Sequence, residues 1–118
     1  MFCHQKLQVY QKAVKFLGAV LRIVRAIPAG NSDVVNQLRR AAMSITLNIA
    51  EGAGKTGLND KKRFYAIARG SALECAAIFD LLLKWELIDQ EFLTPSIEEL
   101  ESIVAILSSL ALNLKVHH

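Results

Sequence analysis

Several features that would assign this sequence to a class of protein are missing from it. No run approaches the roughly 20 apolar residues that span a bilayer, and the N-terminus lacks the charged-then-apolar order of a signal peptide. We therefore expect a cytoplasmic protein with no membrane partner. Cysteine occurs only twice, which is too few for a disulfide framework. Cys75 falls close to the apolar stripe of a predicted helix, so we expect a packed thiol there rather than a disulfide with Cys3.

The motif for nucleotide binding is incomplete. Gly54, Lys55 and Thr56 match the end of a phosphate-binding loop, but Ile49 stands where that loop needs its first glycine. The preceding residues also have helical spacing, whereas the loop requires a strand. We therefore reject a nucleotide site. A smaller role stays open for Lys55 and the nearby glycine amides, which is to hold one phosphate group of a larger polyanion.

Signatures of metal binding and of base-specific recognition are also missing. Cys3, His4, His117 and His118 match no established metal site in their spacing. The sequence has no aromatic ladder, zinc knuckle or helix-turn-helix signature that would recognise bases. We expect no metal and no cofactor, and any nucleic-acid binding would depend on charge and shape.

What the sequence does contain is a high apolar content and an uneven distribution of charge. Apolar residues make up 53% of the chain and the mean hydropathy is +0.30, so we expect extra surface to be buried between subunits. Residues 1 to 73 hold 12 Lys or Arg and 3 Asp or Glu, whereas residues 74 to 118 hold 2 and 8. This asymmetry can steer a polyanion to one region, match subunits head to tail, or simply reflect solvated helix faces.

Apolar residues recur at steps of three and four in four segments, which predicts four helices. The expected ranges are about 6 to 26, 32 to 51, 59 to 85 and 94 onward, joined by short connections. Short connections place consecutive helices side by side. We therefore predict an all-α protein with a single domain over residues 1–118, folded as an antiparallel up-down-up-down four-helix bundle that assembles into a homo-oligomer.

Capping residues mark the expected helix starts. Asn31 or Ser32 can accept hydrogen bonds from the free amides that open the second helix, and Asn59 is the expected cap of the third. Thr94 followed by Pro95 is a strong start signal for the fourth helix. The apolar stripe of that fourth helix includes Ile97, Leu100, Val104, Leu107, Ala111 and Leu114.

Polar side chains follow one edge of the apolar stripe in the second helix and are expected to face Glu74 of the third. Glu74 falls inside the stripe that should face the core, where a lone carboxylate is costly. It should therefore meet cations or hydroxyls of the second helix, or keep its proton. Such a network would fix helix register, while the functional alternative makes Glu74 a general acid or base. No histidine or second acid completes a catalytic pair. The predicted buried polar network comprises Arg39, Arg40, Ser44, Asn48, Glu51, Ser71 and Glu74.

Apolar residues occur on two sides of the third helix, which predicts burial on both sides. We place Ile67, Ile78 and Trp85 on the core side. The second helix also projects apolar side chains away from its stripe, and exposed patches of this kind commonly mark interaction sites. The predicted oligomer interface comprises Met43, Leu47, Tyr65, Leu73 and Leu83.

Basic residues gather on one side of the first helix and around the start of the third. They supply charge for contacts with nucleic-acid phosphates, whose strength falls steeply with salt. The alternative is an ordinary solvated surface. The candidate nucleic-acid-binding residues are Lys12, Lys15, Arg22, Arg25, Lys55, Lys61, Lys62, Arg63 and Arg69.

The run from Gln37 to Gly52 resembles a known family. Its Gln-Leu-Arg-Arg-Ala, Ser-Ile and Asn-Ile-Ala-Glu-Gly elements are similar to those of the 23S rRNA-intervening-sequence proteins, which are small bacterial four-helix bundles. Thr46 stands where that family often has proline, which predicts a less bent helix here. Further similar positions are Phe64, Ile67, Ala68, Gly70, Ser71 and Glu74, with a looser match at Leu7, Val9, Tyr10, Ala13, Ile27 and Pro28.

The resemblance implies a four-helix bundle and a ring-like homo-oligomer, with pentamers among the family's assemblies, more firmly than it implies an activity. The genes of the family lie in inserts within large-subunit ribosomal RNA. We therefore expect a non-enzymatic oligomer that binds RNA or another nucleic acid through a basic surface. The alternative is a structural or protein-binding adaptor without nucleic-acid contact, in which the charges dock subunits to one another.

Overall fold

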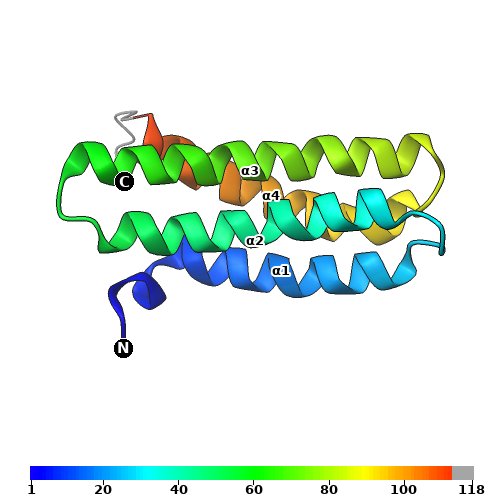
Figure 1. The fold of residues 1–118 in the computed structure, drawn as a ribbon, viewed down its shortest axis with the longest axis horizontal. Helices are drawn as coiled ribbons and strands as arrows, with labels where there is room; N and C mark the ends of the chain where they lie inside the picture. The colour runs from blue at the N-terminus through cyan, green and yellow to red at the C-terminus, as the bar shows by residue number, and fades with distance from the viewer. Residues whose placement is uncertain (113–118) are drawn as a thin grey trace.

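The computed structural model describes residues 1–112, whose four α-helices lie alongside one another (Figure 1). Each helix packs against the next one along the chain, and α1 also packs against α4. Residues 1–112 contain no strand, and none of their helices combines the length and hydropathy that crossing a membrane requires. The elements are a short 3₁₀ helix, η1 (Cys3–Lys6), followed by α1 (Gln8–Ala26), α2 (Ser32–Gly54), α3 (Leu58–Lys84) and α4 (Gln90–Ala111).

The core consists of apolar side chains that point inward from all four helices. The rings of Phe16 in α1 and Phe79 in α3 have centroids 6.1 Å apart, and both side chains are almost completely buried. Burying one such side chain stabilises the fold by about 1.5 to 3 kcal/mol relative to leaving it in water. Other large side chains that are completely shielded are Val20, Ile23, Leu38, Ile45, Ile49, Leu82, Leu93, Ile103 and Leu107.

The turn between α1 and α2 forms where the sequence predicts it, but with a different contact at the cap. Ile27 is extended because Pro28 follows it, and Gly30 has a φ of 95° that suits glycine. Asn31 occupies the position before α2. Its side-chain amide donates to the Pro28 carbonyl at 2.8 Å and makes no capping bond with the amides of α2. The prediction that this side chain caps the helix is therefore wrong.

The third and fourth helices begin earlier than predicted. α3 begins at Leu58, so Asn59 lies inside its first turn and is not the cap. α4 begins at Gln90, which places Thr94 and Pro95 in the second turn of the helix. Proline this close to a helix start removes a single backbone hydrogen bond, and the Thr94 hydroxyl donates to the Gln90 carbonyl at 2.9 Å. The threonine-proline pair therefore sits within the helix and does not open it.

The connection from α3 to α4 depends on a residue with left-handed backbone geometry. Glu86 has a φ of 55°. Its backbone N–H donates to the Leu83 carbonyl at 3.1 Å, and the N–H of Leu87 donates to the Leu82 carbonyl at 2.9 Å. These two bonds form a Schellman motif, which satisfies carbonyls at the end of the helix and usually places glycine at the left-handed position.

The rotation of α3 about its axis differs from the prediction. Ile67 and Trp85 were expected on the core side but are 42% and 57% exposed. Successive residues of a helix point in directions about 100° apart. The core face of α3 is shifted by about one residue from the predicted face, so Glu74 points outward. Glu74 is exposed, and its predicted place in the core is wrong. The buried residues of α3 are Tyr65, Ala68, Ala72, Cys75, Ile78, Phe79 and Leu82.

Candidate nucleic-acid and subunit interfaces

The cations of α1 form a basic surface along the helix. Lys15, Arg22 and Arg25 are exposed and Lys12 is half-buried. Residues 1–26 contain no Asp or Glu, and none of these four side chains forms an ion pair with the part of the chain that the structure describes. Lys15 and Arg25 are ten residues apart, which is about 15 Å along a helix. The surface therefore presents a row of positive charge whose side chains form no ion pair within residues 1–112.

A second group of cations surrounds Phe64 near the connection between α2 and α3. The Nζ atom of Lys55 lies 5.1 Å from the centroid of the Phe64 ring, and the Cζ atom of Arg63 lies 4.5 Å from it. Lys55 Nζ is 3.7 Å from Glu51 Oε2, and Arg63 Nη2 is 3.9 Å from Asp60 Oδ1. Exposed ion pairs at such distances contribute little, so both cations can exchange their carboxylates for phosphates.

Two of the predicted ligand-binding cations have structural roles. The Nζ atom of Lys61 donates to the carbonyls of Gly52 and Ala53 at 3.3 and 2.9 Å, where it neutralises the negative end of α2. The Nε atom of Arg69 donates to Ser108 Oγ at 2.7 Å and links α3 to α4. The predicted cations that remain available to a ligand are Lys12, Lys15, Arg22, Arg25, Lys55, Lys62 and Arg63.

The glycines before Lys55 belong to a helix. Gly52 and Gly54 lie in the last turn of α2, and the Lys55 N–H donates to the Gly52 carbonyl at 3.2 Å. Gly52 makes room for a ring, because a Cβ atom there would lie 2.8 Å from Tyr65 Cε1. Tyr65 is only 7% exposed, and its burial raises the pKa of its hydroxyl. The prediction that Tyr65 contributes to an oligomer interface is therefore wrong, since its side chain packs inside the bundle.

The polar side chains between α2 and α3 form a short hydrogen-bonded chain. The Asn48 amide donates to Ser44 Oγ at 3.0 Å, the Ser44 and Ser71 hydroxyl oxygens are 2.7 Å apart, and the Ser71 hydroxyl donates to the Ile67 carbonyl at 3.2 Å. Because each hydroxyl has one proton, Ser44 must donate to Ser71. The bonds thus join the two helices at one register. Charged side chains stay hydrated outside this chain, so their predicted burial is wrong for Arg39, Arg40, Glu51 and Glu74.

The two cysteines are both free. Cys75 is completely buried, as predicted, and Cys3 is exposed. Burial, helped by the negative charge of Glu74, raises the pKa of the Cys75 thiol to about 12. Cys75 is therefore a neutral packing group without nucleophilic character.

Three residues of the predicted oligomer interface are exposed. Met43 and Leu47 of α2 are 48% and 60% exposed, and Leu73 of α3 is 43% exposed. Leu83 is half-buried against the core. The outer side of α2 also contains a recess of about 530 Å³, which is lined by Asn36, Arg39, Arg40, Met43, Ser44, Leu47 and Asn48.

An apolar groove runs between α3 and α4 and has a volume of about 350 Å³. Of its lining residues, only Leu73 is predicted from the sequence as part of an interface. Ile97 and Val104 are seven residues apart, and the sequence pattern predicts both in the core. In the structure they lie at the edge of the core and are half-buried. The residues that line the groove are Leu73, Ala76, Phe79, Asp80, Ile97, Leu100, Glu101, Val104 and Ala105.

Comparison with protein families assigns the chain to a group. A family model described as 23S rRNA-intervening sequence protein matches residues 5–109. The chain belongs to this family. The matched range includes the α1 cations, the polar chain between α2 and α3, and the groove between α3 and α4. A search of curated proteins finds no significant match.

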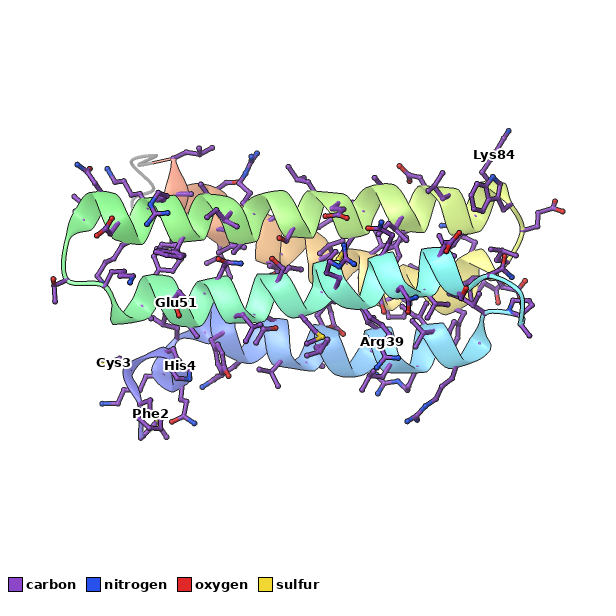
Figure 2. The ribbon with its side chains drawn as sticks, viewed as in Figure 1. Phe2, Cys3, His4, Arg39, Glu51 and Lys84 are labelled. Carbon is purple, nitrogen blue, oxygen red and sulfur yellow. The ribbon has the colours of Figure 1, made fainter. Side chains whose placement is uncertain are left out.

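The N-terminal segment of this member of the 23S rRNA-intervening sequence protein family lies at one end of the bundle. Figure 2 shows Phe2, Cys3 and His4 at the end where Glu51 lies, with Lys84 at the opposite end. The His4 and Tyr10 rings have centroids 4.7 Å apart. No group of three or more metal-ligating side chains occurs within residues 1–112, and His117 and His118 lie outside the described residues.

Proposed function

We propose that this protein is a non-enzymatic homo-oligomer of antiparallel up-down-up-down four-helix bundles that binds RNA or another nucleic acid through its basic surface. The observation that carries the proposal is the row of Lys15, Arg22 and Arg25 on α1. These side chains are exposed and have no ion-pair partner within residues 1–112. Such a row attracts phosphates without recognising bases, because phosphate contacts position a nucleic acid and carry no sequence information.

The cations around Phe64 support the same function. Lys55 in the connection between α2 and α3 and Arg63 in α3 approach one aromatic ring, and each also forms a long ion pair with a carboxylate. Phosphate oxygens can replace these carboxylates at small cost because the pairs contribute little in water. These cations therefore extend the basic surface beyond α1.

The groups that the sequence singles out for chemistry support a non-enzymatic role. Glu74 is exposed and forms no ion pair with the described residues. A catalytic carboxylate usually has a perturbed environment and a partner for proton transfer. Cys75 is buried, and the pKa of its thiol is raised to about 12, so the thiolate that nucleophilic catalysis requires is scarce at neutral pH.

Fluorescence anisotropy with a labelled RNA hairpin and a labelled DNA duplex tests nucleic-acid binding. We expect binding at low salt that weakens linearly in a plot of log affinity against log salt concentration. Replacing both Arg22→Gln and Arg25→Gln should reduce the slope by about 1.4 to 1.8, since each phosphate contact contributes about 0.7 to 0.9.

A control is Lys84→Gln, which removes an exposed positive charge from the last residue of α3, outside the candidate surface. This variant should leave the slope unchanged. Absence of binding to RNA and DNA at low ionic strength would contradict nucleic-acid binding. If the α1 variant lost its oligomeric mass while RNA affinity stayed constant, the adaptor alternative would be supported.

A further inference from the structure

The outer face of α2 carries exposed apolar side chains next to two arginines. Met43 and Leu47 lie one helical turn apart and are 48% and 60% exposed. Arg39 and Arg40 precede Met43 by about one turn, are exposed, and form no ion pair with residues 1–112. Leaving apolar area in water costs about 25 cal/mol for each Å². This face is therefore apolar with a positively charged border. Burying its apolar area against another surface would be favourable.

The groove between α3 and α4 has the opposite charge. Phe79 and Leu100 are buried at its base, and the half-exposed Leu73 is one of its walls. The charged residues that line it are Asp80 of α3 and Glu101 of α4, and both are acidic and exposed. Neither carboxylate forms an ion pair within the described part of the chain. The groove is therefore apolar with a negatively charged border.

The groove between α3 and α4 is long enough to receive the two apolar side chains of the α2 face. Met43 and Leu47 are four residues apart, which separates them by about 6 Å along the helix axis. The groove wall extends at least from Ile97 to Val104, which is about 10 Å on the same scale. Both apolar side chains can therefore enter one groove, and the arginines one turn away from Met43 can reach carboxylates at its border.

We propose that, within the oligomer of the proposed function, the α2 face of one copy docks on the α3–α4 groove of a second copy. Met43 and Leu47 enter the groove, while Arg39 and Arg40 pair with Asp80 and Glu101. A second copy of this chain is the occupant because one chain carries both complementary surfaces.

The contact is heterologous, since its two surfaces are different patches of the subunit. Each copy therefore contacts one neighbour through α2 and another through the groove. Contacts of this kind close into rings or extend into filaments. The α1 cations stay outside the contact and remain available to phosphates.

Charge reversal with light-scattering measurement of the solution mass tests this proposal. The first variant combines Arg39→Glu with Arg40→Glu, and the second combines Asp80→Lys with Glu101→Lys. Each should lower the mass to that of a single chain at a concentration where the wild type is oligomeric. The variant with all four changes should regain the wild-type mass, because its charges are again opposite across the contact.

The matched control reverses two other arginines, Arg22→Glu with Arg25→Glu, and carries the same change in net charge as the first variant. It should keep the wild-type mass while losing RNA affinity. Circular dichroism confirms that each variant retains its helices. All the substituted side chains are exposed, so we expect folding to be unaffected.

The possible outcomes separate this inference from the proposed function. Wild-type mass in both two-residue variants would overturn the α2–groove contact while leaving the oligomer intact. A folded variant with all four changes that remains a single chain would also overturn it, as would dissociation of the α1 control. A wild type that is a single chain at every concentration would overturn the oligomer itself, and with it the contact.

Discussion

Alanine at Gly52 and alanine at Gly70 should change stability in opposite directions. Gly52 lies in the last turn of α2 and Gly70 lies within α3, and neither has a positive φ. Alanine is more favourable than glycine in a helix by about 1 kcal/mol. Nothing lies within 4 Å of a Cβ atom added at Gly70, so Gly70→Ala should stabilise by about 0.5 to 1 kcal/mol.

The result at Gly52 depends on the ring of Tyr65. An added Cβ atom would lie 2.8 Å from Cε1, 3.0 Å from Cδ1 and 3.2 Å from Cζ of that ring. Tyr65 is 7% exposed, so the ring has little room to withdraw. Inserting a carbon into a packed interior costs about 1 to 3 kcal/mol. After the propensity gain of at most about 1 kcal/mol is subtracted, Gly52→Ala should destabilise by about 1 kcal/mol.

Urea unfolding followed by circular dichroism measures both changes. All variants are compared at one protein concentration, because the proposed self-association would make apparent stability depend on concentration. In a Tyr65→Ala background the ring is absent, so Gly52→Ala should lose its penalty, which a double-mutant cycle detects. If Gly52→Ala stabilised the wild-type protein as much as Gly70→Ala, the steric argument would be refuted.

The remaining predictions concern Cys75, Glu86 and Glu74. A thiol reagent should label Cys3 and leave Cys75 unlabelled in the folded protein, because Cys75 is buried with a raised pKa; labelling of both without denaturant would contradict this. The pKa of the Cys75 thiol rises from the ordinary 9.0 to about 12 on folding, so the folded state holds its proton longer and the urea midpoint should fall as pH rises from 9 toward 12. Glu86→Gly should stabilise by about 1 kcal/mol in thermal melts, since the left-handed geometry at φ 55° costs an L-residue about 1 to 2 kcal/mol and glycine little; a lower melting temperature would count against it. Glu74→Gln should change the free energy of unfolding by less than about 0.5 kcal/mol because the side chain is exposed, whereas a large loss would restore the prediction of a buried carboxylate.

The sequence predicts the inward face of α2 well because one regular apolar stripe defines it. Leu38, Ala42, Ile45 and Ile49 recur at three and four, and all of them are buried. In such helices the spacing alone identifies the inward face. The four-helix composition and the position of the first turn follow from the same pattern, together with Pro28 and Gly30.

The pattern of α3 does not define its rotation. Apolar residues occupy most of its sides, so several inward faces satisfy the spacing equally well. The prediction chose a face with Ile67 and Trp85, and this choice placed Glu74 in the core and Tyr65 outside. Tyr65 instead packs on Gly52 of α2, a contact between two helices that the spacing within α3 does not contain.

Contacts between helices account for the remaining misses at the candidate interfaces. Lys61 donates to carbonyls of α2, and Arg69 donates to a hydroxyl of α4. Local spacing contains no information on such partners. The groove that includes Asp80 and Glu101 likewise exists only once α3 and α4 are placed side by side. The chain from Asn48 through Ser44 to Ser71 was predicted in part, because these residues fall on one edge of a stripe.

We propose that this protein self-assembles and binds nucleic acid through its basic surface. Sedimentation velocity of the wild type with a labelled RNA hairpin at low salt measures both parts together. We predict a particle that contains more than one chain and carries the RNA, and from which added salt releases the RNA while the chains stay together. A single chain that sediments separately from free RNA at low ionic strength would contradict the account.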